Sequence, residues 1–114
     1  NRLSQKKLIP ETEVTVRVED RRPPFSKNAN TDALAVTAQA IYQDLGKTLE
    51  PVAMRFGTDA GFAYNPANPK QTVIDGLGIV GDKLHNPDEW ADLDSVVPRI
   101  YLTVKLLETS LSAK

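Results

Sequence analysis

The first clear pattern along the chain is an alternation of apolar and polar residues between positions 13 and 20. Val14, Val16 and Val18 are separated by polar side chains, and this period of two predicts a strand with one buried and one solvated face. The next stretch, RRPPFSKNAN at 21 to 30, contains prolines and several turn-forming residues. We therefore expect a crossing segment without regular structure, which joins two structural units.

Beyond this segment, apolar residues recur at helical spacing in two regions, which predicts two amphipathic helices. Asn30 or Thr31 is expected to cap the first helix, and Gly46 to end it in a left-handed turn. Asp94 or Ser95 is expected to cap the second helix. The predicted apolar stripe of the first helix contains Leu34, Ala38, Ile41, Tyr42 and Leu45. That of the second helix contains Val97, Ile100, Tyr101, Val104, Leu107 and Leu111.

Two short apolar runs, PVAMRF at 51 to 56 and TVID at 72 to 75, predict strands between the helices. The first run leads through Gly57 into a short helix whose first turn contains Thr58 and Asp59. Alternating strands and helices are typical of an α/β fold, in which helices cover a parallel sheet. Because two short core strands are too few for a stable parallel sheet, we expect further strands from outside this chain.

The composition is ordinary for a soluble globular protein, with 114 residues, of which 40% are hydrophobic and 25% charged. A net charge of -1 provides no overall field that would attract nucleic acid or an anionic membrane. No apolar run approaches the roughly 20 residues that span a bilayer. We therefore expect neither nucleic acid nor a membrane as a partner. The absence of cysteine excludes disulfides and thiolate metal ligands but does not indicate a compartment.

His85 is the single histidine, and it lies in a loop between glycines and acidic residues. Loops at the carboxyl ends of strands are where α/β proteins bind ligands, so His85 is a candidate functional residue. The alternative is an ordinary solvated loop histidine. Nearby Asp82, Asp88 and Glu89 do not have the spacing of a metal site. A metal site built from this chain alone is therefore not predicted.

A second candidate site is GTDAG, at 57 to 61. A glycine at the start of a helix offers backbone N–H groups that can receive a carboxylate or phosphate. The alternative is that Thr58 and Asp59 only cap the helix. Arg21 and Arg22 either clamp a substrate carboxylate or are simply solvated. The glycine-rich GLGIVG does not match the dinucleotide fingerprint, because no helix follows it directly and its third glycine falls at the wrong interval.

Taken in order, these stretches resemble the C-terminal part of the zinc-dependent exopeptidases typified by glutamate carboxypeptidase, a family that includes aminoacylases and acetylornithine deacetylases. The matching motifs are QKKLIPETEVTVRVEDRRPPF, RFGTDAGFAY and VIDGLGIVGDKLHNPDEWADLDSVVPRIYLTVKLLETSL. The resemblance implies the C-terminal portion of a three-layer α/β/α catalytic domain, preceded by the last strand of an α+β lid and dimerisation domain. Residues 1 to 20 then form the lid strand, 21 to 30 the crossing linker and 31 to 114 the catalytic portion.

In this family two zinc ions activate a water molecule and polarise the scissile carbonyl, while a glutamate acts as general base. The last zinc ligand is a histidine near the C-terminus, to which His85 corresponds. Arg22, Gly57 and Thr58 correspond to residues that bind the substrate carboxylate. Two acidic residues are expected to support the site without binding metal, namely Asp59 and Glu89. The resemblance thus implies a peptide or N-acyl amino acid substrate and a homodimer.

The family's other zinc ligands and its general base belong to an N-terminal part that lies outside this chain. We therefore expect the chain alone to be inactive, and its uncovered apolar helix faces to associate with each other or with that N-terminal part. The leading function is hydrolysis of the amide bond before a C-terminal amino acid. The alternatives are an N-acyl amino acid amidohydrolase or deacetylase of the same family, and a non-catalytic interaction domain.

Overall fold

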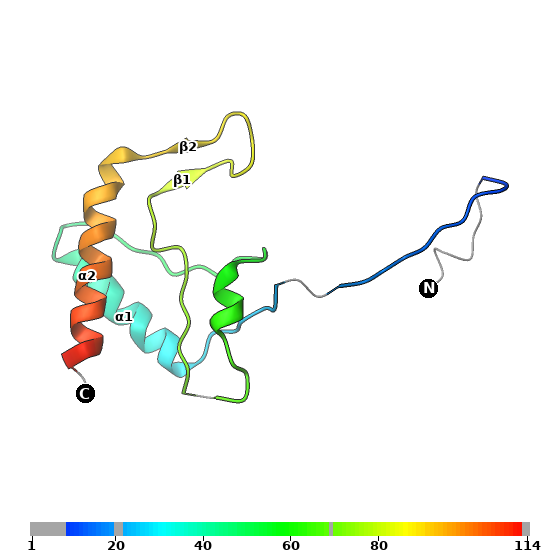
Figure 1. Cartoon of the computed structure of the whole chain (residues 1–114). Helices are drawn as coiled ribbons and strands as arrows, with labels where there is room; N and C mark the ends of the chain where they lie inside the picture. The colour runs from blue at the N-terminus through cyan, green and yellow to red at the C-terminus, as the bar shows by residue number, and fades with distance from the viewer. Residues whose placement is uncertain (1–8, 20–21, 69, 113–114) are drawn as a thin grey trace.

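The computed structural model describes residues 9–19, 22–68 and 70–112, and Figure 1 shows how their elements are arranged. Residues 1–8, part of the expected lid strand, and Arg21 lie outside the described residues. Two helices of 15 and 17 residues are joined by long irregular segments that carry short helices and a small sheet. In chain order the elements are α1 (Ala29–Gln43), η1 (Asp59–Ala63), β1 (Gly81–Asp82), β2 (Trp90–Ala91), η2 (Leu93–Ser95) and α2 (Val96–Ser112).

Helix α1 begins at Ala29, earlier than the predicted caps Asn30 and Thr31. Asn28 is the N-cap, and its Oδ1 accepts the backbone N–H groups of Asn30 and Thr31, each at 3.0 Å. The Thr31 hydroxyl in turn accepts the N–H of Asn28 at 3.3 Å, which completes a capping box. Thr31 therefore takes part in the cap as the reciprocal partner rather than as the N-cap itself. Gly46 has a φ of 67°, so the predicted left-handed turn after the helix is confirmed.

Helix α2 follows directly from the short helix η2. Asp92 caps η2, and its Oδ1 accepts the N–H of Asp94 at 3.0 Å. Ser95, one of the two predicted caps, is instead buried: its hydroxyl donates to the Asp92 carbonyl at 2.6 Å and accepts the Val80 N–H at 2.8 Å. These bonds tie the start of α2 to the segment that enters β1. Pro98 lies in the first turn of α2, where its missing N–H costs little.

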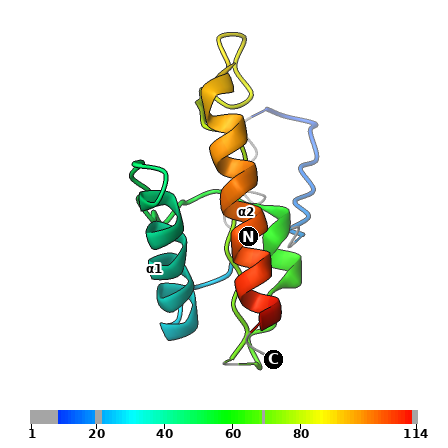
Figure 2. The same cartoon turned by 90° about the vertical axis from the view of Figure 1, so that its left-hand side faces the viewer.

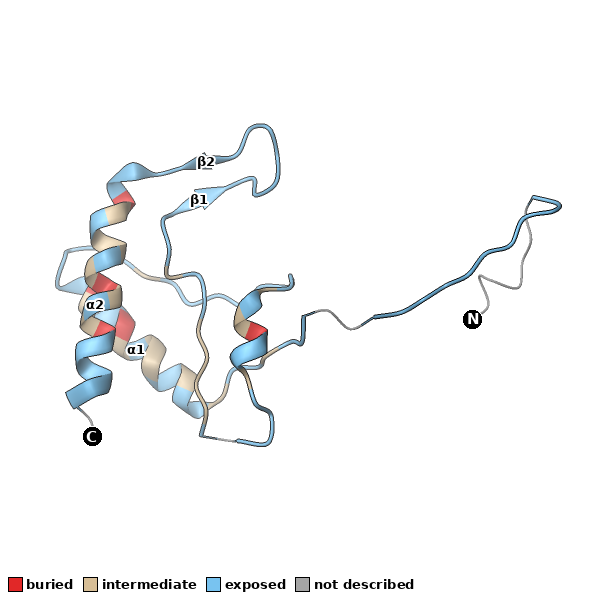
Figure 3. Ribbon diagram, viewed as in Figure 1, coloured by how far each residue is buried: buried red, intermediate tan, exposed pale blue. Residues whose placement is uncertain are grey.

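The hydrophobic core lies where α1 packs against α2, and Figure 3 shows most of the buried positions gathered there, with others on η1 and at the start of α2. Its buried members are Ala38, Tyr42, Leu102 and Leu106. Ile74 and Leu77 from the segment after η1 are partly buried against this core. The guanidinium of Arg99 lies over the Tyr42 ring, 5.4 Å from its centroid, in a cation–π arrangement.

The apolar stripe predicted for α2 is not the face that packs in this structure. Leu102 and Leu106 are buried, and with 3.6 residues per turn they lie on the side of the helix opposite Val104. Within the predicted stripe, Tyr101 is half-buried. The other members are exposed, namely Val97, Ile100, Val104, Leu107 and Leu111. The predicted stripe is therefore present but exposed, and Leu102 and Leu106 form a second apolar side that spacing alone did not identify as the one that meets α1.

The strands predicted over 13 to 20, 51 to 56 and 72 to 75 are not formed within the described residues. The described sheet has two strands, β1 and β2, which pair antiparallel with Gly81 opposite Ala91. A strand requires backbone hydrogen bonds to a neighbouring strand, and no described segment pairs with the three predicted ones. The observed chain is thus a mixed helix and strand structure, and a parallel three-layer arrangement stays a prediction.

The chain is open rather than closely packed, as Figures 1 and 2 show from two directions. Its Cα radius of gyration is 20.1 Å, whereas a compact domain of about 100 residues has about 13 Å. The described N-terminal segment extends away from the helices, and its Val18 is 81% exposed. Among the described residues, no helix has the length and apolar character needed to cross a membrane.

Candidate functional site

The crossing segment docks on the loop before η1, and Arg22 makes the contact. Its Nε donates a hydrogen bond to Asp59 Oδ1 at 2.8 Å. The same side chain covers Gly57, because a Cβ added there would lie 3.3 Å from the Arg22 Cδ. The arginine and the glycine loop, which the sequence indicated separately as carboxylate-binding elements, are therefore adjacent in the structure.

The close approach continues along the next residues of the crossing segment. A Cβ added to Gly61 would lie 2.0 Å from the carbonyl oxygen of Pro23, so only glycine fits there. Two residues after Pro23, the ring centroid of Phe25 lies 6.4 Å from the ring centroid of Tyr64, the residue that follows η1. Residues 22–28 of the crossing segment have no regular structure, as predicted, whereas Ala29 and Asn30 already belong to α1. The contacts described above hold the crossing segment along η1.

Thr58 caps η1 and also joins it to a second segment. Its Oγ1 accepts the N–H of Ala60 at 3.3 Å and donates to Asp75 Oδ2. Asp75 Oδ1 accepts the N–H of Gly76 at 2.7 Å. These two hydrogen bonds, first that from Thr58, hold the pKa of Asp75 below its ordinary value, against a smaller opposing effect of burial. We refer to five residues as the Arg22 cluster, namely Arg22, Gly57, Thr58, Asp59 and Asp75.

His85 lies in the hairpin loop between β1 and β2. Lys83 and His85 have φ values of 59° and 64°. This is the left-handed backbone conformation, which residues other than glycine rarely adopt. Local hydrogen bonds hold this loop: the Asn86 N–H donates to the Lys83 carbonyl at 3.0 Å, and Glu89 Oε2 accepts the backbone N–H of His85 at 3.2 Å. Glu89 thus supports the backbone of His85, while the exposed imidazole forms no hydrogen bond with any described residue.

The two candidate groups lie apart. In Figures 1 and 2 the hairpin with His85 extends beyond one end of α2, away from η1 and the Arg22 cluster. The described residues contain no group of three or more histidine, cysteine, aspartate or glutamate side chains placed to hold a metal ion. The residues seen here therefore do not by themselves fit a zinc ion, because a protein zinc site needs at least three ligands.

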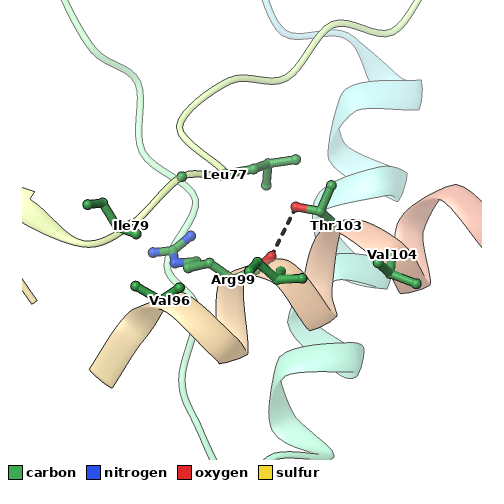
Figure 4. Close-up of a pocket in the computed structure, with 8 residues that line it drawn as sticks. Leu77, Ile79, Val96, Arg99, Thr103 and Val104 are labelled. Carbon is green, nitrogen blue, oxygen red and sulfur yellow. Dashed lines mark hydrogen bonds between the residues drawn. The ribbon is translucent and has the colours of Figure 1, made fainter. Parts of the chain in front are cut away.

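A shallow apolar hollow of about 420 Å³ lies elsewhere, between α2 and the segment that leads to β1. In Figure 4, Leu77 and Ile79 face Val96, Arg99, Thr103 and Val104 across this hollow. None of the predicted site residues lines it. Its lining carries few polar groups for orienting a substrate, so we assign it to packing rather than to chemistry.

Asp75 is the member of the Arg22 cluster that the sequence did not indicate. It was assigned only to the end of a predicted strand, and Thr58, its partner, is 17 residues away. No local spacing connects the two positions, because the contact depends on how the segment after η1 folds back. Asp59, expected to support the site, forms an ion pair with Arg22.

Known proteins match nearly the whole chain. The sequence pattern of the peptidase family M20/M25/M40 matches residues 3–109. Carboxypeptidase G2 from Pseudomonas sp. (strain RS-16) is 34% identical over 107 residues, which are 91% of this chain and 25% of that protein. This chain thus spans about a quarter of the length of the curated relative it matches. No solved structure matches it. The resemblance seen in the motifs is confirmed, and the chain belongs to the peptidase family M20/M25/M40.

Proposed function

We propose that this chain supplies the carboxylate-binding loop and one zinc ligand of a metallopeptidase that hydrolyses the amide bond before a C-terminal amino acid. The observation that carries the proposal is the contact of Arg22 with Gly57 and Asp59, the last 37 residues away in sequence. Membership of a peptidase family and similarity to a carboxypeptidase support the hydrolase function.

Arg22 is held in a way that leaves it available to a ligand. Asp59 engages its Nε, while the two terminal nitrogens of the guanidinium form no hydrogen bond with a described residue. The side chains of Arg22 and Asp59 are 54% and 81% exposed, so a substrate can reach them. The backbone N–H groups of Gly57 and Thr58 likewise have no hydrogen-bond partner among the described residues. A free α-carboxylate suits this combination of donors, because it can accept hydrogen bonds both from the guanidinium nitrogens and from backbone N–H groups.

In this proposal His85 binds zinc together with ligands from outside the described residues. Bound zinc would supply a water molecule of lowered pKa and would polarise the scissile carbonyl. The contribution of this chain is to hold the imidazole. Glu89 Oε2 accepts the backbone N–H of His85, and the imidazole ring is exposed in the hairpin loop. Two zinc ions, a general base and a homodimer are proposed for the full-length protein on the basis of family membership.

An N-acyl amino acid amidohydrolase or deacetylase is the alternative within the same chemistry. The Arg22 cluster contains groups that suit the carboxylate that both classes of substrate carry, so it does not distinguish a peptide from an N-acyl amino acid. Hydrolysis rates for a panel of peptides and N-acyl amino acids, varied on each side of the scissile bond, would separate the two activities.

The proposed function is tested by substituting His85 in the full-length protein. We expect H85A to lower kcat/KM by about 100-fold or more and to reduce the zinc bound per chain, because a ligand is lost. D44N is a suitable control, since Asp44 is an exposed residue at the end of α1, outside both candidate groups. The 114-residue chain alone is expected to show no turnover with added zinc. Unchanged activity and zinc content in H85A would contradict the proposal.

A further inference from the structure

Asp75 belongs to no motif that indicated a function, yet it is bonded to the loop proposed to bind the substrate. We propose that Asp75 is a positioning residue for substrate binding: it acts through Thr58 and holds the backbone of Gly57 and Thr58 in place for the substrate carboxylate. This inference rests on the proposed function of the loop. It is carried by the hydrogen bond from Thr58 Oγ1 to Asp75 Oδ2.

The directions of the hydrogen bonds determine what Thr58 can do. A hydroxyl has one proton, and Thr58 donates it to Asp75. Its oxygen accepts the N–H of Ala60 at 3.3 Å. With the proton committed to Asp75, the Thr58 side chain does not donate to a substrate, and the residue contributes to carboxylate binding through its backbone N–H. Asp75 therefore sets the geometry of the loop without touching the substrate.

Asp75 connects the loop before η1 with a segment that packs against the helical core. The preceding residue, Ile74, packs against the core formed by α1 and α2. Asp75 Oδ1 accepts the N–H of Gly76 at 2.7 Å, and Gly76 has a φ of 75°, which glycine adopts without strain. One carboxylate oxygen thus binds its own segment and the other binds Thr58. The loop before η1 is in this way fixed relative to the helical core.

The charge of Asp75 has a different effect from its position. A negative carboxylate near the loop opposes an anionic ligand by Coulomb repulsion, so charge does not explain a favourable role in binding. An asparagine keeps one acceptor oxygen, which can serve the Thr58 hydroxyl, but it loses the acceptor for the Gly76 N–H and carries no charge. D75N is therefore expected to retain most of the substrate binding, whereas D75A, which has no acceptor, is expected to weaken it. The two variants separate positioning from charge.

The experiment uses the full-length, zinc-loaded protein with the variants D75A, D75N, T58V and T58V/D75A. D44N is the matched control, because the Asp44 carboxylate forms no hydrogen bond with a described residue. We would measure kcat and KM for an N-acyl amino acid and for its C-terminal amide, which lacks the carboxylate. Zinc content and thermal midpoint show whether each variant is folded and metal-bound.

D75A is expected to raise KM for the acid about tenfold, with a change in kcat of less than about twofold and no change in KM for the amide. T58V should have the same effect. The double variant should be no worse than T58V alone, because both substitutions remove the same hydrogen bond. D75N and D44N should remain close to the wild-type protein.

Two outcomes would overturn the inference while the proposed function stands. Effects of D75A and T58V that multiply in the double variant would mean that Asp75 does not act through Thr58. Equal losses for the acid and the amide would mean that Asp75 only supports the fold. If D75A does not fold, T58V decides, because an unchanged preference for acid over amide in T58V contradicts the inference. A wild-type protein inactive on every substrate would overturn the proposed function, and this inference with it.

Discussion

At the scale of single residues, the Arg22 cluster is held by two contacts of different strength. The ion pair of Arg22 with Asp59 is exposed on both sides, so solvent screens it, and such pairs contribute about 0–1 kcal/mol. The hydrogen bond from Thr58 to Asp75 has an ionised acceptor and is accompanied by a lowered pKa of Asp75. The second contact therefore makes stability depend on pH in a way that can be measured.

We expect the contribution of Asp75 to stability to disappear in acid. Because the folded protein holds the pKa of Asp75 below its ordinary value of 3.8, the unfolded chain binds a proton more readily at this site. The stabilisation is thus fully present above the ordinary value and is lost as the pH falls through the lowered pKa. Thermal midpoints of the full-length wild-type protein and D75N, measured from neutral to acid pH, would show the difference.

The sign of that result is specific. The midpoint of the wild-type protein should fall relative to that of D75N as the pH is lowered, because D75N has no carboxyl group to protonate at this position. D44N, which also lacks one carboxylate, shows what a change of net charge does by itself. A difference between wild type and D75N that stays constant over the whole range would show that Asp75 is not stabilised in its ionised form.

At the scale of elements, the crossing segment and η1 fit together because Gly61 has no side chain. We expect G61A to destabilise the full-length protein by about 1–3 kcal/mol, since the new Cβ would collide with the backbone oxygen of Pro23, which no side-chain rotation can relieve. The displaced segment also carries Arg22, so KM for a carboxylate substrate should rise. Denaturant unfolding and steady-state kinetics measure the two effects.

Gly78 offers a matched control for this substitution. A Cβ added there meets nothing within 4 Å, and Gly78 is not among the glycines with positive φ. G78A should therefore leave stability and KM near the wild-type values. If G61A proved as mild as G78A, the docking of the crossing segment on η1 would not be a tight contact in solution.

The helices were predictable from the sequence because their signals are local. Apolar spacing identified both α1 and α2, and Gly46 ended the first as expected. The cap of α1 was displaced to Asn28, because Asn28, Asn30 and Thr31 are all suitable side chains and only the three-dimensional bond pattern selects among them. The three predicted strands were not recovered, since a strand depends on partners that are often distant in sequence, and in the described residues only β1 and β2 find such partners.

The candidate site was predictable only where its residues are neighbours in sequence. Gly57, Thr58 and Asp59 are consecutive, and their pattern already indicated a capped helix start. The contact of Arg22 with this loop required a resemblance to known exopeptidases, because the two positions are far apart in the chain. Asp75 gave no signal at all, since its role depends on a hydrogen bond between two irregular segments.

At the scale of the whole molecule, α2 is apolar on two opposite sides. Leu102 and Leu106 face α1, and the exposed stripe lies on the other side, with Val97 74% and Leu111 71% exposed. A helix that is apolar around most of its circumference is normally buried on both sides. The apolar hollow beside α2, lined in part by Ile79, continues this surface. We propose that the N-terminal part of the catalytic domain covers it in the full-length protein.

The isolated 114-residue chain is therefore expected to associate with itself through the exposed stripe of α2, because exposed apolar patches of this kind drive association. Sedimentation velocity should show species larger than a monomer, in proportions that rise with concentration. V104E and L107E together place two charges on the stripe and should shift the chain towards the monomer. Q43E, on an exposed polar position of α1, is the control for added charge and should leave the distribution unchanged.

The same surface should bind the N-terminal part of the catalytic domain in preference to a second copy of this chain. Mixing this chain with the N-terminal part is expected to replace the self-associated species by a one-to-one complex. Once the N-terminal part covers α2, its apolar stripe is no longer available to a second copy of the chain. V104E/L107E should weaken that complex as well, whereas Q43E should not. If the wild-type chain remained a single monomeric species at high concentration, or if the N-terminal part bound equally well to V104E/L107E, the exposed side of α2 would not be an interface.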